Sequence, residues 1–328
     1  MALRLMKTHR LLVLSDIHYS SLGERDRGHP ENAVICNPFL RISARMFRHF
    51  IWLRDPHAHN SLLDSFMAQA GEPDVVVAVG DYSIDSAFIG VSDDAACASA
   101  QGCLARLRGR FGSRFLAVPG DHELGKMSLF GGAGGPRLAS WERMQDDLGL
   151  RPFWQLDLDA HRLVGVTSSL VALPVFETEV LPGEWPAWQA LREAHLTEIR
   201  KAFDTLEAGR RIILFCHDPT ALPFLWREES VRRRAAQIDL TMIGHLHSNL
   251  ILWKSRVLAG MPAINFMGSS IRRMSGALNR AKDWRPFKAV LCPALAGIEM
   301  LKDGGYYELE LDPSAQTGPR LHWMPLKR

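Results

Sequence analysis

The clearest pattern along the chain is a series of short apolar runs, each of which ends at a cluster of polar residues. The runs are rich in Val, Ile and Leu and cover residues 11–14, 75–79, 115–118, 212–215 and 241–243. Short runs of this composition are typical of buried β-strands. The polar cluster that follows each run therefore stands at the carboxyl end of a predicted strand.

Helix-like segments separate several of these runs. They are predicted over residues 61–70, 96–110 and 186–208, the last of which places Trp188, Leu196 and Phe203 near helical spacing. Strands that alternate with helices indicate an α/β layered fold, in which ligands bind beyond the carboxyl ends of the strands. One more strand is predicted at residues 163–166. Residues 170–185 are expected to form a long loop of the kind that is often functional.

Beyond residue 243 the pattern changes. Residues 257–267, 289–291, 297–301 and 306–311 are predicted to be strands without helices between them. We expect this tail to form a second antiparallel sheet or an extension of the first. The whole chain, residues 1–328, is expected to be a single domain with a β-rich C-terminal extension at about residues 257–325.

Composition narrows the function only slightly. Of the 328 residues, 47% are hydrophobic and 23% are charged, as in ordinary globular proteins, and the net charge of +3 does not by itself indicate nucleic acid or a membrane. The five cysteines form no CxxC pair, so a disulfide framework is not expected. No apolar stretch approaches the ~18 residues of a membrane span. We expect a cytoplasmic protein, and nothing in the sequence indicates its oligomeric state.

Side chains that bind metals stand at all five predicted strand ends. They are Asp16, His18, Asp81, Asp121, His122, His217, His245 and His247. Carboxylates and imidazoles suit Mn, Fe and Zn. Alternate residues of an extended segment point to the same side, which would pair Asp16 with His18 and His245 with His247. A set of this size exceeds the needs of one ion and suits two ions about 3.5–4 Å apart that share a carboxylate.

Glycines accompany three of the five motifs. Gly80, Gly120 and Gly244 allow tight turns that bring the backbone close to a ligand cluster. A single Asp-x-His or Gly-Asp occurs often by chance. The indication comes from five motifs that all fall at the ends of predicted strands.

In chain order the motifs form a recognisable series. They read Asp16-Ile17-His18, Gly80-Asp81, Gly120-Asp121-His122-Glu123, His217 and Gly244-His245-Leu246-His247. This order resembles that of the calcineurin-like metallophosphoesterase family, and the resemblance spans residues 11–248. It implies a sandwich of two mixed β-sheets flanked by helices, in agreement with the α/β class that the residue pattern indicates.

The resemblance also implies a centre with two divalent or trivalent metal ions, for which Mn or Fe is favoured and Zn is a further candidate. The first ion would bind Asp16, His18 and His247. The second ion would bind Asp121, His217 and His245. Asp81 would bridge both ions. His122 matches the histidine that helps the leaving group depart, a general-acid role often worth about 10²–10⁴-fold in rate.

Asp121 departs from the family pattern, which usually has Asn at this position. A third carboxylate should bind metal more tightly, but it should also weaken the Lewis acidity of the ions and repel an anionic phosphate. We expect an active enzyme with an altered metal preference. The alternative is a catalytically weak metal-binding scaffold or interaction module that keeps the fold.

Three other acidic residues lie near the motifs. Glu123 is expected to bond backbone or to orient a neighbour rather than to bind metal. Asp85 and Asp218 are candidates for carboxylates that fix the tautomers of ligand imidazoles.

The gap between the first two motifs looks long for the family. Residues 20–60 are therefore predicted to be an insertion, and one interpretation is a cap over the site. Within it, residues 39–54 combine four aromatic side chains with four arginines. A helix that contacts a membrane surface is one interpretation, but we favour a helix that buries one face on the sheet and leaves its arginines in solvent.

Together these features predict a metal-dependent hydrolase of phosphoesters. Phosphodiesters are favoured over monoesters, because many members of the family act on diesters. Nucleic acid is not an expected partner, since no strong stripe of basic and aromatic residues is present. The substrate itself cannot be named, because proteins with one fold differ in the loops and caps around the site.

Overall fold

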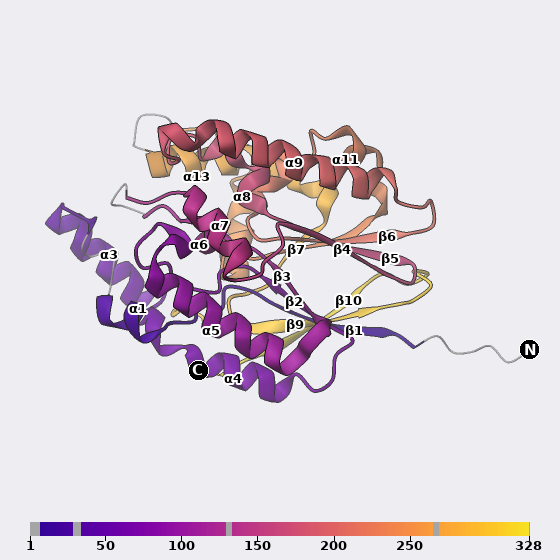
Figure 1. The fold of residues 1–328 in the computed structure, drawn as a ribbon, viewed down its shortest axis with the longest axis horizontal. Helices are drawn as coiled ribbons and strands as arrows, with labels where there is room; N and C mark the ends of the chain where they lie inside the picture. The colour runs from indigo at the N-terminus through magenta and orange to yellow at the C-terminus, as the bar shows by residue number, and fades with distance from the viewer. Residues whose placement is uncertain (1–6, 29–33, 129–132, 265–268, 328) are drawn as a thin grey trace, which may run out of the picture.

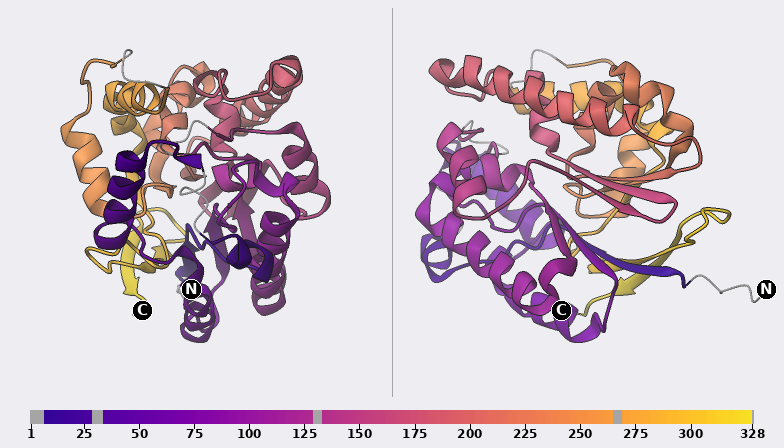
Figure 2. Two further views of the ribbon diagram at one scale, coloured as in Figure 1. Left: turned by 90° about the vertical axis from the view of Figure 1, so that its left-hand side faces the viewer. Right: turned by 45° about the vertical axis from the view of Figure 1, so that its right-hand side comes forward.

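Two five-stranded sheets packed face to face, with helices on both outer surfaces, make up the fold (Figure 1). The structure is a computed structural model that describes residues 7–28, 34–128, 133–264 and 269–327, and of residues 269–274 it describes the backbone alone. The expected sandwich of two mixed sheets flanked by helices is confirmed. The right panel of Figure 2 shows the two sheets between their helical layers.

The first sheet has the order β10-β9-β1-β2-β3. Strands β1 (His9–Leu14), β2 (Val75–Val79) and β3 (Phe115–Val118) are parallel, and β9 (Gly305–Leu311) and β10 (Arg320–Pro325) add an antiparallel hairpin to the edge of β1. The second sheet has the order β4-β5-β6-β7-β8. Its strands are β4 (Phe153–Leu158), β5 (His161–Val166), β6 (Arg211–Cys216), β7 (Ile238–Ile243) and β8 (Ala289–Leu291), all parallel except β4.

The alternation of side chains along each strand divides the core into layers. In β2, Val75, Val77 and Val79 lie between the sheets, where they belong to the same cluster as Ile213 and Phe215 of β6. The alternate β2 residues belong to the cluster beneath the helices of the first sheet. Strands that are buried on both faces carry continuous apolar runs, which explains why the sequence identified them.

Three helices cover much of the outer faces of the sheets. They are α4 (Asn60–Gln69) and α5 (Asp94–Phe111) on the first sheet and α9 (Trp185–Asp204) on the second. Each overlaps a helix predicted from the sequence. The Asp93 side chain accepts a hydrogen bond from the Ala96 amide at the start of α5, and Gly112, with φ of 58°, ends it.

The other helices lie in the two layers or at the edge of the sandwich. The remaining α-helices are α1 (Leu22–Arg27), α3 (Pro38–Phe50), α6 (Asp121–Leu124), α7 (Leu138–Asp146), α8 (Ser168–Val171), α10 (Leu222–Leu225), α11 (Glu229–Arg233), α12 (Asn249–Val257) and α13 (Ser269–Arg280). The 3₁₀ turns are η1 (Pro56–Ala58), η2 (Gly90–Ser92), η3 (Gly112–Arg114), η4 (Leu173–Val175), η5 (Pro182–Glu184), η6 (Pro219–Ala221), η7 (Ala235–Gln237) and η8 (Ala281–Phe287). Of the helices in these described ranges, none combines the length and the apolarity that a membrane crossing requires.

The C-terminal third differs from the all-strand tail predicted for it. Helix α12 ends at Val257, residues 258–264 form no strand, and residues 265–267 lie outside the described residues. Helix α13 follows, and residues 297–301 form turns. Strands β8 and β9 stand where they were predicted, but they join different sheets. An apolar run alone does not distinguish a strand from a helix or a buried turn.

Two further differences are smaller. Strands β4 and β10 were not predicted, and residues 170–185 contain the end of α8 and two 3₁₀ turns rather than an irregular loop. The limits of the insertion at residues 20–60 and of the C-terminal extension stay predictions.

Helix α3 stands apart from both layers, at the left edge of Figure 1. Ala44 is its one buried residue. The expectation that this helix buries its apolar face on the sheet is therefore wrong.

Candidate metal centre

The carboxyl ends of β1, β2, β6 and β7 meet at one edge of the sandwich. Backbone hydrogen bonds tie the ends of β1 and β2 together, from the Asp16 amide to the Gly80 carbonyl (3.2 Å) and from the His18 amide to the Asp81 carbonyl (3.0 Å). The His245 amide donates to both carboxylate oxygens of Asp16 at 3.1 Å, which links β7 to β1 across the two sheets. The strand ends thus bring the candidate ligands of both sheets into one cluster.

Five of the eight candidate residues adopt the left-handed backbone conformation. Their φ values are 49° for Asp16, 50° for His18, 59° for Asp81, 64° for His245 and 59° for His247. The Asp-x-His and His-x-His pairs therefore do not lie on extended segments, and the geometric reason given for pairing them was wrong. Left-handed non-glycine residues cost about 1–3 kcal/mol each and concentrate at functional sites, where the surroundings impose them. This clustering marks the strand ends as a site built for its side chains.

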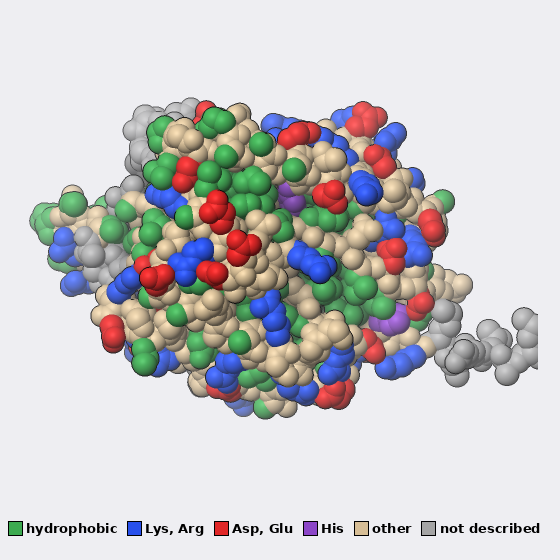
Figure 3. Space-filling view, viewed as in Figure 1, with side chains coloured by type: hydrophobic (Ala, Val, Ile, Leu, Met, Phe, Trp, Pro, Cys, Tyr) green, Lys and Arg blue, Asp and Glu red, His purple; other side chains and the backbone are tan. Residues whose placement is uncertain are grey.

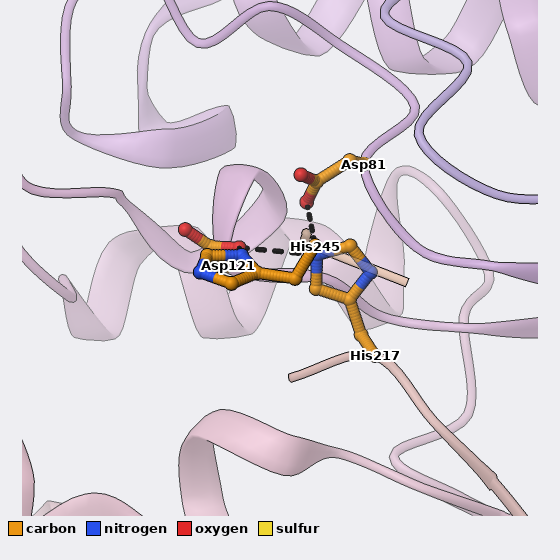
Figure 4. A group of neighbouring side chains, drawn as sticks. All are labelled: Asp81, Asp121, His217 and His245. Atoms are coloured by element: carbon orange, nitrogen blue, oxygen red, sulfur yellow. Dashed lines mark hydrogen bonds and ion pairs between the residues drawn. The ribbon is translucent and has the colours of Figure 1, made fainter. Parts of the chain in front are cut away.

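One group of ligand atoms joins Asp81, Asp121, His217 and His245, all within 4.8 Å of one another (Figure 4). His217 Nε2 lies 3.1 Å from Asp81 Oδ1 and 3.2 Å from Asp121 Oδ1. His245 Nδ1 lies 3.0 Å from the same Asp121 oxygen. The structure thus brings together the three residues assigned to the second ion and the predicted bridge.

A second group joins Asp16, His18 and His247. His18 Nε2 and His247 Nε2 lie 3.2 Å apart, and His247 Nε2 lies 3.3 Å from Asp16 Oδ1. Asp81 connects the two groups, because its ligand atoms also cluster with those of His18 and His122. Its Oδ1 faces His217, whereas its Oδ2 lies 3.5 Å from His122 Nε2. This is the arrangement that a bridging carboxylate needs.

Two backbone carbonyls fix the tautomers of three of these histidines. His217 Nδ1 donates to the Val79 carbonyl (2.6 Å), and His18 Nδ1 (3.3 Å) and His122 Nδ1 (2.8 Å) both donate to the Ser83 carbonyl. A carbonyl oxygen can only accept, so in each neutral ring the lone pair is at Nε2. That lone pair faces carboxylate oxygens or another imidazole nitrogen. Acceptors that face acceptors require a proton or a metal ion between them, and the donor set therefore fits a metal centre.

These two backbone carbonyls fix the tautomers, a role that was suggested for the carboxylates of Asp85 and Asp218. The sequence could not reveal this, because every residue has a backbone carbonyl whatever its side chain. The Asp85 carboxylate instead accepts hydrogen bonds from the amides of Ile89, Gly90 and Lys126. Asp218 accepts from the Thr220 amide and caps η6. Neither carboxylate fixes an imidazole through these bonds.

Close packing of the candidate ligands shifts the pKa values of His217 and Asp16 upward. Burial lowers the pKa of His217, but the Asp81 carboxylate and the Asp121 hydrogen bond outweigh it and raise that pKa well above its usual range. Burial raises the pKa of Asp16 to about 7, against the opposing charge of His217. These shifted values are what closely packed ligands produce when no cation separates them.

Burial also keeps the two histidines of the second group, the Asp16 group, uncharged. It lowers the pKa of His247 to about 3, and together with His122 and His247 it lowers the pKa of His18 well below its usual value. A neutral imidazole is the form that binds a metal. The two histidines of the Asp16 group are therefore already in the binding form at neutral pH.

The Glu123 carboxylate stabilises the backbone turns that carry Asp81 and Asp121. Its carboxylate accepts hydrogen bonds from the amides of Gly120 (2.8 Å), Asp81 (3.1 Å) and Tyr82 (2.8 Å), which confirms that it bonds backbone. Gly120 is required by close approach, because a Cβ there would lie 2.5 Å from the Asp81 amide nitrogen and would overlap its carboxylate. The expectation that glycine brings backbone against the ligand cluster is confirmed at this position.

Trp52 is a further part of the site that the sequence did not reveal. Its ring stacks on the His247 imidazole, with 4.6 Å between centroids and 29° between planes, and Phe47 stacks behind it at 6.1 Å. The Glu299 amide donates to the Trp52 carbonyl (2.7 Å) and anchors the segment. The aromatic richness of residues 39–54 was visible, but the pairing of Trp52 with a distant histidine was not.

Solvent reaches the centre from one side. The His245 side chain is 36% exposed and that of Asp121 is 15% exposed, whereas the Asp16 and His217 side chains are completely buried. A substrate would therefore meet Asp121 and His245 first.

This arrangement agrees with the comparison to known families. The family model of the calcineurin-like phosphoesterases matches residues 9–249, from the start of β1 to the start of α12. The chain belongs to this family. The motifs that carry the resemblance in the sequence all lie within the matched residues, as do all the candidate ligands of this calcineurin-like phosphoesterase.

One solved structure agrees at the level of the fold. A dimetal phosphatase from Danio rerio is similar with a TM-score of 0.50 and 13% identity, over 92% of each chain. Phosphopantetheinyl hydrolase from Mycobacterium tuberculosis is 15% identical over 73% of this chain and 83% of its own, with a TM-score of 0.36. No curated protein matches the sequence.

Proposed function

We propose that this calcineurin-like phosphoesterase hydrolyses phosphoesters at a two-metal centre, with Asp16, His18 and His247 at one ion and Asp121, His217 and His245 at the other. The observation that carries this proposal is the pair of ligand groups that Asp81 joins. In these groups the lone pair of a histidine Nε2, such as that of His217, faces a carboxylate oxygen or another imidazole nitrogen. When bound, the two ions would supply Lewis-acid polarisation of the phosphoryl group and lower the pKa of water. Mn or Fe is favoured and Zn is a further candidate.

His122 is the residue proposed to protonate the leaving oxygen. The bond from its Nδ1 to the Ser83 carbonyl fixes the ring, so that Nε2 lies beside Asp81 Oδ2 at the junction of the two groups. Its backbone amide also donates to Asp81 Oδ1 (3.2 Å), which holds the start of α6 against the predicted bridge. Burial lowers the pKa of His122, and the charge of Asp81 opposes that shift and favours the protonated ring that a general acid requires.

The third carboxylate supports a preference for phosphodiesters. Asp16, Asp81 and Asp121 all contribute oxygens to the centre. A phosphomonoester carries up to two negative charges near neutral pH and a diester carries one, so added negative charge in the site repels a monoester more strongly. The proposed substrate class is therefore a phosphodiester of unspecified identity.

Asp121 also supports a second candidate, a metal-binding scaffold with weak or no turnover. Its Oδ1 contacts both His217 and His245, so its charge is placed where it would tighten metal binding and offset the charge of the ions. In that case the centre would retain metal but would not activate water efficiently.

The experiment that tests the proposal compares turnover of bis-p-nitrophenyl phosphate and p-nitrophenyl phosphate by protein loaded with Mn, Fe or Zn. We expect faster hydrolysis of the diester and a loss of about 10²–10⁴-fold in His122→Ala at unchanged metal content. His322→Ala, which removes an exposed histidine of β10, serves as the control and should retain full activity. Full metal occupancy without hydrolysis of either ester would favour the scaffold.

A further inference from the structure

Helix α3 directs its apolar side away from the protein. Phe39, Ile42, Met46 and Phe50 are 79%, 55%, 57% and 61% exposed. They follow one another at steps of three, four and four residues, so they form one continuous stripe along the helix. A helix on the surface of a globular protein normally packs such a stripe on the core, and an exposed stripe of this size marks a binding surface.

The side of α3 that faces the protein lies between the apolar side of the helix and its basic side. Ala44 is buried there, and Arg41 donates through Nε (2.9 Å) and Nη2 (2.7 Å) to the Ile35 carbonyl. Asn37 caps the helix by accepting from the Phe39 amide, and Pro38 occupies the first turn. The cap and the proline therefore define the start of the helix, and the contacts of Ala44 and Arg41 hold it on the side away from the stripe. The apolar stripe remains exposed to solvent.

The charge of α3 has one sign. Residues Pro38–Phe50 contain Arg41, Arg45 and Arg48 and no Asp or Glu. Arg45 is exposed and lies next to the stripe. In Figure 3 the end of the molecule formed by α3, at the left, carries hydrophobic and basic side chains. An apolar stripe flanked by arginines is the surface that binds an anionic bilayer, where each basic residue near the surface contributes separately.

A second copy of the chain fits this surface less well. Two α3 helices packed stripe to stripe would bring the arginines of one copy beside those of the other, and like charges across an interface oppose association. Anionic headgroups would instead attract them. Charge complementarity therefore favours lipid over self-association.

The apolar surface continues from α3 toward the metal centre. Ile51, Met300 and Leu301 are 37%, 49% and 47% exposed, and the Met300 amide donates to the Ile51 carbonyl (3.2 Å). The next residue, Trp52, stacks on His247. Docking through α3 would therefore place the centre beside the docked surface.

We propose that α3 docks this protein on an anionic phospholipid bilayer, with Phe39, Ile42, Met46 and Phe50 inserted at the boundary between headgroups and acyl chains. The docking stands on the helix alone. Its consequence, that the centre acts on phosphoester groups at the membrane surface, rests on the proposed function.

The test is cosedimentation of the metal-loaded full chain with vesicles of phosphatidylcholine alone and of phosphatidylcholine mixed with phosphatidylglycerol, at low and high salt. We expect binding to the mixed vesicles that weakens with salt. Arg45→Glu should weaken it roughly 25-fold, because two charges change and each is worth about fivefold. The double variant Phe39→Ser and Phe50→Ser should weaken it by at least about tenfold. Trp323→Ser and Arg320→Glu, which alter exposed residues of β10, are the matched controls and should bind as the original protein does.

Hydrolysis of soluble bis-p-nitrophenyl phosphate is measured in parallel and should not change in the α3 variants. A protein that binds vesicles but hydrolyses nothing would contradict the proposed function and leave the docking proposal supported. Equal binding to both kinds of vesicle, unchanged binding by the α3 variants, or a dimer that the α3 variants dissociate without any vesicle binding would each overturn the docking proposal. Arg45→Glu alters an exposed position, so it tests docking even if the double variant does not fold.

Discussion

The Trp52 ring stacks on the His247 imidazole at a centroid distance of 4.6 Å. This contact joins a candidate metal ligand at the end of β7 to the segment that follows α3. His247 has a left-handed backbone and a neighbour, His18, only 3.2 Å from its Nε2. The indole therefore restricts a ring whose position is otherwise set by a strained turn.

Replacement of Trp52 by alanine should loosen metal binding at the Asp16 group. A stacked aromatic pair contributes about 0.5–1.5 kcal/mol beyond its buried area, so the affinity for one ion should fall by about twofold to thirteenfold. Trp52→Phe keeps a stacking ring and should stay near the original affinity. Chelator competition measures both, with Trp253→Ala, an exposed tryptophan of α12, as the control. Equal losses for phenylalanine and alanine would show that stacking is not the cause.

Asp121→Asn should raise turnover of a phosphodiester and change the metal preference. The substitution removes one of three carboxylate charges but keeps an oxygen that can accept from His217 and His245. With one negative charge fewer among the ligands, the ions should be stronger Lewis acids and the anionic substrate should be repelled less. The same loss of charge should weaken metal binding. Turnover is measured at saturating Mn, Fe and Zn.

Asp218→Asn is the matched control for this experiment. Asp218 also acts electrostatically on His245, but its main bond is to the Thr220 amide, which asparagine can still make. If Asp121→Asn changes neither turnover nor metal preference, the charge argument is wrong.

His195 should make the fold sensitive to acid. It is buried in α9, its Nε2 accepts from the Thr167 amide (3.1 Å), and burial lowers its pKa to about 3 from 6.5. Because the folded pKa is the lower one, the stabilisation is complete above pH 6.5 and is lost as the pH falls toward 3. At pH 5 the loss is about 2 kcal/mol.

His195→Gln removes this titration while keeping an oxygen for the Thr167 amide. Urea unfolding from pH 7 to pH 4 should therefore show a shallower fall in the free energy of unfolding for the variant. His322→Gln on β10 should follow the original protein. Parallel curves for His195→Gln and the original protein would refute the assignment.

The sequence predicted the parts of the fold that depend on burial alone. Strands such as β2 are short, rich in Val and apolar on both faces, which favours a buried strand over a helix. The polar residues that follow them meet because parallel strands end at one edge. Strand β4 was missed because Phe153–Leu158 alternates only in part and lies at a sheet edge. The run after Val257 was misread because apolar residues also end helices and line turns.

The side chains of the candidate site were predictable from the sequence, but their backbone conformations and contacts were not. The left-handed turns at Asp16 and His247, the Val79 and Ser83 carbonyls and the Trp52 contact arise from tertiary structure. The outward stripe of α3 is a similar case. Periodicity shows that a helix has an apolar side, but only packing decides whether that side faces the protein or the solvent.

The most direct test of the central claim is metal content measured together with turnover on the same sample. Purified protein is analysed for bound metal, stripped with a chelator and reloaded, and hydrolysis of bis-p-nitrophenyl phosphate is followed at each stage. We predict two ions per chain, loss of hydrolysis on stripping and recovery on reloading. Two ions per chain with no hydrolysis at any stage, or hydrolysis that survives complete removal of metal, would contradict it.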